Sequence, residues 1–159
     1  MNETVTIPAQ FNGPPGSGNG GYAAGAFAEF LEGAAEVTLR SPPPLDQPMQ
    51  VVREGNGLVV RNGETLVGEV RPSTLSLDVP DCPDAGAVRT AVRRFVEFKK
   101  DDFHRCFVCG AERAVGDGLC LRTGPIDGSE IVATEWIPHE NFAGTDGLIP
   151  QRILWSALD

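Results

Sequence analysis

The chain has 159 residues, of which 41% are hydrophobic and 22% are charged, a composition typical of a folded protein rather than a disordered one. Its 22 acidic residues outnumber its 13 basic ones, which gives a net charge of −9 without any cluster of lysine or arginine. This balance argues against nucleic-acid binding and against docking on an anionic membrane.

The sequence also predicts where the protein resides. No stretch is apolar for the roughly 20 residues of a membrane span, and residues 1–4 lack the basic start of a signal peptide. Four cysteines in a chain without an export signal are expected to remain thiols. We therefore expect a cytoplasmic protein that does not associate with membranes.

The N-terminal half begins with a short strand and a glycine-rich turn that leads into an apolar helix. Residues 4–10 predict the strand, with Pro8 restricting it to an edge or a strand end. The helix is expected over residues 20–31, because residues 22–31 are apolar on nearly every face and carry one charge, Glu29. A helix without a polar face has to be covered on all sides.

The turn at the start of this helix is a candidate catalytic site. The first backbone N–H groups of a helix have no partner within it, and the helix dipole makes that end weakly positive. Asn19 and Gly20 are the candidate catalytic residues, and Gly21 and Tyr22 are the candidate substrate-binding ones. The bare amides at the two glycines suit a carbonyl or an oxyanion. A glycine-rich connection into a core helix is the alternative.

Four strand-like stretches follow, at residues 35–40, 49–53, 57–61 and 65–70. Asn62-Gly63 is a strong hairpin signal and Asn56-Gly57 a weaker turn signal. An antiparallel meander that wraps around the apolar helix would give that helix the cover it needs. The pattern therefore predicts an α+β fold of the hotdog type, in which an antiparallel sheet surrounds a central helix.

The next region, residues 76–103, is expected to be a linker followed by a crossover helix. Apolar residues at helical spacing place the helix at residues 85–99. Its three arginines, Arg89, Arg93 and Arg94, suggest either a clamp for coenzyme phosphates or simply a solvated helix face.

The C-terminal third returns to strands and ends in a second apolar helix. Strands are expected at residues 119–122 and 130–136, and the helix within 147–159, beginning near Pro150. His139 lies in the loop before this helix and is expected to be exposed rather than catalytic. The second helix needs the same cover as the first, so we expect either a longer gene product or another chain that supplies the covering sheet.

Four motifs give this third a more specific resemblance, at residues 106–110, 118–119, 132–136 and 147–159. They resemble the opening of hotdog thioesterases of the phenylacetate-pathway type. In that family a Cys-x-x-Cys-Gly start and two strands precede a His-Gly-Gly turn, and an acid follows nine residues after the His. Asp159 matches the acid, but Pro150 stands in place of the His. In the N-terminal half Asn19 begins a matching Asn-Gly-Gly turn, but Ala28 stands in place of the acid.

The resemblance implies a tandem, double-hotdog protein. Its parts would be a first repeat at residues 1–75, the linker and crossover helix at 76–103, and a truncated start of a second repeat at 104–159. The active site of the family combines a glycine amide from one central helix with a carboxylate from the other. Carried over, Gly20 or Gly21 would polarise a thioester carbonyl, and Asp159 would activate water or attack as nucleophile. A purely structural role for Asp159 is the alternative.

The reciprocal site implied by the same arrangement lacks an acid. Gln151 or Arg152 would stand at its turn, and Ala28 would stand opposite. Glu29 is one residue further on, rotated by roughly 100° around the helix, and is a candidate for a displaced acid.

The implied function is that of a thioesterase-like hydrolase acting on an acyl-CoA or acyl-carrier thioester, with no cofactor. The implied association is a dimer or other homo-oligomer, or a continuation of the chain that completes the second repeat. A hotdog hydratase would carry an Asp/His pair near the helix, and none is evident. A non-catalytic acyl-ligand binding or interaction module is the alternative from another class.

The cysteines suggest a competing site. Cys106 and Cys109 have the spacing of half a zinc knuckle, and His104, Cys82 or Cys120 are candidates to complete the coordination. A second closely spaced ligand pair is missing, so we expect no tightly bound zinc. A redox pair and buried thiols in a tight turn are the other interpretations.

Overall fold

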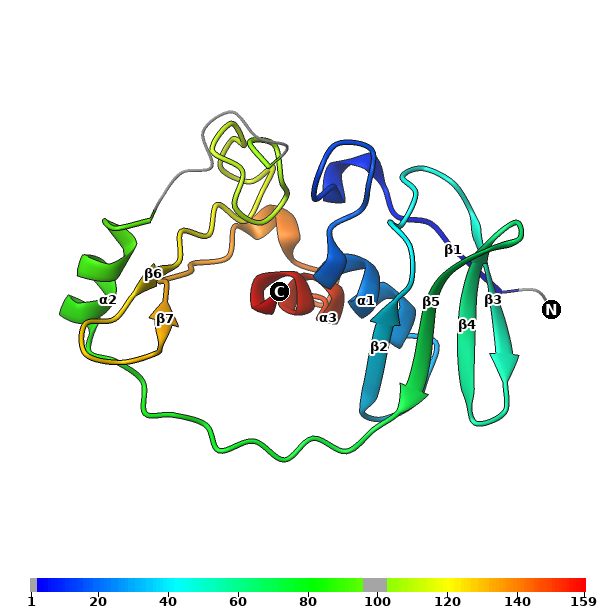
Figure 1. The fold of residues 1–159 in the computed structure, drawn as a ribbon. Helices are drawn as coiled ribbons and strands as arrows, with labels where there is room; N and C mark the ends of the chain where they lie inside the picture. The colour runs from blue at the N-terminus through cyan, green and yellow to red at the C-terminus, as the bar shows by residue number, and fades with distance from the viewer. Residues whose placement is uncertain (1–2, 96–102) are drawn as a thin grey trace.

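The computed structural model describes residues 3–95 and 103–159. Within these residues the chain is an α+β protein with a five-stranded antiparallel sheet, a two-stranded ribbon and three α-helices (Figure 1). A search of the same residues for a helix long and apolar enough to cross a membrane finds none.

The five-stranded sheet has the order β1-β3-β4-β5-β2, so its centre is a meander of three consecutive strands. The two strands of the C-terminal third form a separate two-stranded ribbon. The strands are β1 Glu3–Val5, β2 Ala35–Leu39, β3 Met49–Glu54, β4 Gly57–Asn62, β5 Thr65–Pro72, β6 Gly124–Pro125 and β7 Val132–Ala133. The helices are α1 Gly20–Ala28, α2 Ala85–Val92 and α3 Gln151–Leu158, with the short 3₁₀ helices η1 Ala9–Phe11 and η2 Glu140–Phe142.

The four predicted strands of the meander region are confirmed to within two residues. The predicted hairpin at Asn62-Gly63 forms, and the weaker turn signal at Asn56-Gly57 corresponds to a hairpin whose turn lies one residue earlier, at Gly55-Asn56. Each turn has a glycine of positive φ, Gly55 at +61° and Gly63 at +58°. Glycine adopts this backbone conformation without the steric cost that other residues incur. The predicted first strand is shorter than expected, because η1 occupies residues at the end of the predicted range.

Helix α1 lies against one face of the sheet, as predicted from its lack of a polar face (Figure 1). Phe27 is fully buried and Tyr22 is 3% exposed. The ring of Phe27 packs over Gly68 of β5, where an added Cβ would lie 3.0 Å from the ring. The helix ends at Ala28 rather than at residue 31, and Phe30 beyond it is only half-buried.

Helix α3 packs antiparallel along α1, so α1 lies between α3 and the sheet (Figure 1). Two glycines make the close approach possible. A Cβ on Gly21 would lie 2.5 Å from the Trp155 carbonyl oxygen, and one on Gly25 would lie 2.7 Å from the Arg152 Cα. Contacts this short do not occur between real atoms, so only glycine fits at these two positions of α1.

The predicted helix near Pro150 is confirmed, with α3 beginning at the next residue. One face of α3 buries Ile153 and Ser156 against the rest of the molecule. Its outer face is open among the described residues, where Leu154 is 44% exposed and Leu158 is 88% exposed.

The strands predicted for the C-terminal third are largely wrong. Residues 119–122 form no strand, because Cys120 has a φ of +53°, which breaks an extended conformation. This segment instead hydrogen-bonds to the Cys-x-x-Cys turn, through Leu119 N–H to the Phe107 carbonyl and Leu121 N–H to the Val108 carbonyl. The second predicted strand, at residues 130–136, is reduced to the two residues of β7.

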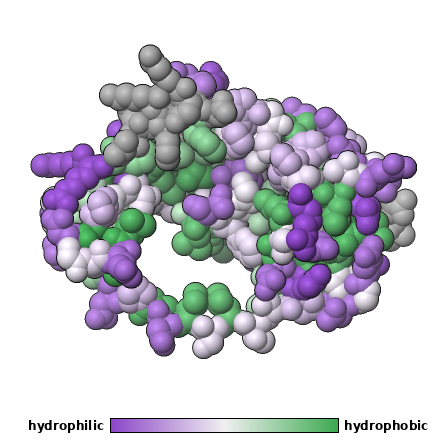
Figure 2. Space-filling view, in the orientation of Figure 1, coloured by the Kyte–Doolittle hydropathy of each residue, from purple (hydrophilic) through white to green (hydrophobic). Residues whose placement is uncertain are grey.

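The linker region is an extended connection followed by a short helix. The connection exposes Leu75, Leu77 and Val79, and Figure 2 shows an opening between it and the rest of the molecule. Helix α2 covers only the first part of the predicted range, and residues 96–99 of that range lie outside the described residues. Arg94 forms an ion pair with Asp127. Its guanidinium is therefore bound within the chain rather than free to bind a coenzyme phosphate.

Candidate functional site

The N-terminus of α1 is built around Asn19, which is 5% exposed. Its side-chain oxygen accepts the backbone N–H of Tyr22 at 2.9 Å, an N-cap that satisfies one of the donors that a helix leaves open. The preceding turn is fixed by two backbone bonds, from Asn19 N–H to the Phe11 carbonyl and from Gly18 N–H to the Pro43 carbonyl, each 2.8 Å long. The candidate turn therefore has a defined conformation.

Asp159, at the C-terminal end of α3, lies beside this turn. Its Oδ2 accepts a long hydrogen bond of 3.4 Å from the Asn19 side-chain amide. An added Cβ on Gly20 would lie 3.4 and 3.5 Å from the two carboxylate oxygens, so the carboxylate sits against a residue without a side chain. The structure thus brings together the three candidate catalytic residues. A helix N-terminus favours a negative charge at this place.

The two candidate substrate-binding residues have packing roles instead. Gly21 is buried where α3 crosses α1. The ring of Tyr22 stacks on Phe11, with centroids 3.8 Å apart and an interplanar angle of 9°. Burial raises the pKa of the Tyr22 hydroxyl, although its hydrogen bond to Arg152 opposes this. Neither these two residues nor Gly20 lines the cavity beside Asn19 and Asp159.

A cavity of about 390 Å³ lies beside Asn19 and Asp159. This volume falls within the range of small-molecule sites. Both polar and apolar side chains line it. The polar ones are Asn19, Cys106, Cys109, Thr123 and Asp159, and the apolar ones are Phe95, Phe103, Val108, Leu121 and Ala157.

Sequence reasoning did not place the two cysteines at this cavity. The Cys-x-x-Cys-Gly motif signals a tight turn, but the segment that carries it is brought to α1 by long-range backbone bonds such as Phe107 N–H to the Asn12 carbonyl, 2.7 Å. The Cys109 thiol donates a hydrogen bond to the Cys106 sulfur. This bond is the main reason that the pKa of Cys106 is lowered to about 6, and burial opposes the shift. Backbone N–H groups of the turn and the charge of Arg113 lower it further.

The other ligands considered for zinc lie elsewhere. Cys82 is exposed in the linker region, and the Cys120 thiol is directed at backbone carbonyls, including that of Gly118 at 3.6 Å. His104 lies 4.0 Å from a Glu112 carboxylate oxygen. Among residues 3–95 and 103–159, no group of three or more His, Cys, Asp and Glu side chains is arranged to hold a metal ion.

The opposite end of the helix pair holds an ion pair. Arg152 donates to both carboxylate oxygens of Glu29, from Nε at 2.9 Å and from Nη2 at 2.5 Å. The guanidinium also lies over the Tyr22 ring, 5.9 Å from its centroid. Glu29 is therefore neutralised by a partner at close range, and Ala28, which stands in the expected acid position, is buried.

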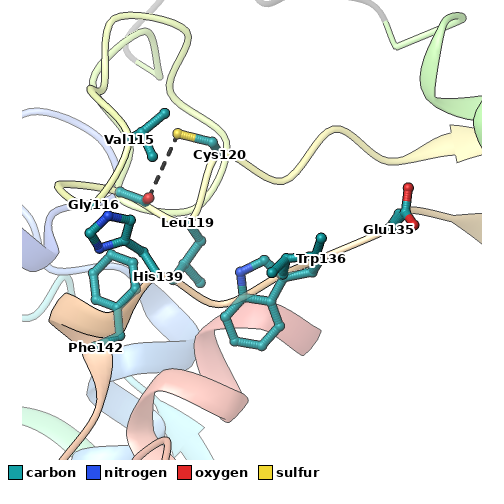
Figure 3. A pocket seen from close by; sticks show the side chains of 10 residues that line it. Val115, Gly116, Leu119, Cys120, Glu135, Trp136, His139 and Phe142 are labelled. Carbon is teal, nitrogen blue, oxygen red and sulfur yellow. Dashed lines mark hydrogen bonds between the residues drawn. The ribbon is translucent and has the colours of Figure 1, made fainter.

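A second cavity, of about 270 Å³, lies in the C-terminal third (Figure 3). Leu119, Trp136 and Phe142 form much of its apolar lining, while Glu135 lies apart from them. His139 is half-buried rather than exposed, and its Nδ1 accepts the backbone N–H of Asn141 at 3.2 Å. His139 is thus the N-cap of η2, which is a structural role.

Comparison of the chain with protein-family models, with curated proteins and with solved structures finds no match.

Proposed function

We propose that this chain is a thioesterase-like protein on a hotdog-type scaffold, and that it hydrolyses an acyl thioester, such as an acyl-CoA, in the cavity beside Asn19 and Asp159. The observation that carries the proposal is the position of the Asp159 carboxylate, which lies against Gly20 and the Asn19 side chain at the N-terminus of α1. A carboxylate and bare helix amides at one place suit the addition of water to a carbonyl.

In the proposed reaction the thioester carbonyl oxygen approaches the backbone N–H of Gly20, which lies in the first turn and has no carbonyl partner within α1. Asp159 takes a proton from a water molecule as the water oxygen bonds to the carbonyl carbon. The carbon–sulfur bond then breaks, and the thiol leaves with that proton. Asn19 orients the carboxylate through its 3.4 Å hydrogen bond.

The walls of the cavity support an acyl substrate. Phe95, Phe103 and Leu121 offer apolar contacts for an acyl chain, while Asn19 and Asp159 line the same cavity. Burial of a CH₂ group stabilises a complex by about 0.8 kcal/mol, so each carbon of the acyl chain that reaches this wall adds to the affinity.

The test is the turnover of a panel of acyl-CoA thioesters of increasing chain length, measured by thiol release. Asp159→Asn removes the proposed base and is expected to lower kcat by about 10²–10⁴-fold without loss of the fold. Asp78→Asn is the matched control, because Asp78 lies in the exposed connection before α2. Glu29→Gln is also expected to retain activity, since Glu29 is held by Arg152.

Full activity in Asp159→Asn would contradict the proposed site. Saturable binding of acyl-CoA without turnover by the unmodified chain would contradict hydrolysis and favour the non-catalytic acyl-ligand module. If the chain neither binds nor hydrolyses any acyl-CoA of the panel, the acyl-thioester proposal is wrong.

A further inference from the structure

The turn that carries Cys106 and Cys109 is closed and firmly attached. The Gly110 N–H donates to the Cys106 carbonyl at 2.9 Å, and an added Cβ on Gly110 would lie 2.5 Å from that same oxygen. Between the two cysteines, Phe107 is fully buried in the core. A chain that closes this tightly brings the Cα atoms of residues three apart to within about 7 Å, which is within reach of a disulfide.

The two sulfur atoms interact directly, since the Cys109 thiol donates a hydrogen bond to Cys106. Backbone N–H groups of Val108 and Cys109 also donate to the Cys106 sulfur, and Arg113 lies close enough to favour a negative charge. Together they stabilise the thiolate of Cys106, whose pKa is about 6, while Cys109 supplies the proton of the shared hydrogen bond. The thiolate is the form of cysteine that attacks other sulfur atoms.

Both cysteines line the 390 Å³ cavity, so a small molecule in that cavity can reach the two of them. Cys106 is only 4% exposed, which leaves the cavity as its route to solvent. The described residues provide no third ligand that would turn the pair into a metal site. A pair of interacting thiols at a cavity wall is instead suited to disulfide chemistry.

We propose that Cys106 and Cys109 form a redox-active dithiol that reduces low-molecular-weight disulfides entering this cavity. The Cys106 thiolate attacks one sulfur of the small disulfide, the S–S bond breaks, and one thiolate leaves and takes up a proton from solvent. Cys109 then loses its proton and attacks the Cys106 sulfur of the mixed disulfide. The second small thiol leaves, and a Cys106–Cys109 disulfide remains. The small disulfide gains two electrons, which the dithiol loses.

This inference does not rest on the proposed hydrolysis, because disulfide exchange needs the two thiols and not Asp159. The two sites share one cavity, and the probes separate them: oxidised glutathione reports on the thiols, and an acyl-CoA reports on Asp159. Failure of one therefore leaves the other standing.

The test uses the reduced, full chain with oxidised glutathione at neutral pH, followed by iodoacetamide quenching and peptide mass spectrometry. The peptide that contains Cys106 and Cys109 is expected to lose two hydrogen atoms. In Cys109→Ser the second step is blocked, so glutathione is expected to remain on Cys106. The serine hydroxyl keeps a hydrogen-bond donor beside the Cys106 sulfur, so attachment there should be several-fold faster than attachment to Cys82.

Three further measurements make the result specific. Cys82→Ser is the matched control and should form the Cys106–Cys109 disulfide at the unmodified rate, since Cys82 is exposed in the linker region. The alkylation rate of Cys106 should rise through about pH 6 and then level off, in an environment that contains Cys109, Arg113 and Asp159. Cys106→Ser should abolish the disulfide, and circular dichroism checks its fold.

Three outcomes would overturn the proposal. One is a peptide in which iodoacetamide has alkylated both Cys106 and Cys109 while oxidised glutathione has modified other cysteines. Another is Cys109→Ser carrying glutathione on Cys82 or Cys120 but not on Cys106. The third is attachment at Cys106 that is no faster than at Cys82. Because the unmodified chain and Cys109→Ser decide these outcomes, the proposal stays testable even if Cys106→Ser does not fold.

Discussion

The two ends of the α1–α3 helix pair carry one carboxylate each, in opposite surroundings. At one end Asp159 faces an uncharged amide and a glycine at the start of α1. At the other end Glu29 is held by both donors of the Arg152 guanidinium. The helices run antiparallel, so each end combines the first turn of one helix with the last turn of the other.

The difference lies in the first turn that each carboxylate meets. The first turn of α1 offers glycine and no charged side chain, so the Asp159 carboxylate meets the Asn19 amide and Gly20 and lines the neighbouring cavity. The first turn of α3 offers Arg152, which forms a bidentate pair with Glu29. The carboxylate of Asp159 therefore borders a cavity, whereas that of Glu29 joins two helices through an ion pair.

The comparison depends on the close approach of the two helices, and Gly21→Ala is expected to disturb it most. The new Cβ would lie 2.5 Å from the Trp155 carbonyl oxygen, which forces the backbones apart. We expect a loss of about 1–3 kcal/mol in the free energy of unfolding, the usual cost of overpacking. Urea denaturation measures it.

Gly20→Ala is the matched control for that substitution. Its Cβ would meet Asp159 at 3.4 Å, an ordinary contact distance, so its stability should stay close to that of the unmodified chain. Equal stability of the two variants would show that α1 and α3 are not held at the distance described here.

A smaller effect is expected from Asn19→Ala, which removes the cap of α1 and the amide beside Asp159. Loss of an N-cap costs about 1 kcal/mol, and the Tyr22 N–H would lose its partner. Asn19→Ser keeps an oxygen that can cap the helix and should recover most of this stability, although it is too short to reproduce the bond to Asp159. Thermal unfolding of both variants measures the difference. If Asn19→Ala unfolds like the unmodified chain, the cap contributes nothing.

Local sequence signals predicted the N-terminal half well, because each element there is determined by neighbouring residues. The glycines at the two hairpin turns fix where the strands reverse, and the apolar character of α1 requires a sheet beside it. The C-terminal third lacks such signals. Residues 119–122 look like a strand, yet the N–H groups of Leu119 and Leu121 donate to the carbonyls of a distant turn at Phe107 and Val108, which no local pattern encodes.

The candidate site was partly predictable for the same reason. The resemblance of Asn19-Gly20-Gly21 and Asp159 to one family motif suggested that they meet, and the structure places them in contact. Tyr22 follows the same turn in the sequence, but its ring is buried and stacks on Phe11, so its role in substrate binding stays a prediction. The joint position of Cys106 and Asp159 at one cavity depends on long-range packing, which spacing within the sequence does not reveal.

The smallest effect is expected at the other end of the helix pair, in a double-mutant cycle of Glu29→Gln and Arg152→Gln. The side chains of Arg152 and Glu29 are 37% and 32% exposed, so solvent screens their attraction, and a coupling free energy of about 0.5 kcal/mol is expected despite the bidentate geometry. Urea denaturation of the two single variants and the double variant measures it, and the coupling should shrink further at high salt because both groups are partly exposed. A coupling of several kcal/mol that persists in high salt would contradict this expectation. It would mean that the Glu29–Arg152 ion pair is a main source of stability for the α1–α3 helix pair.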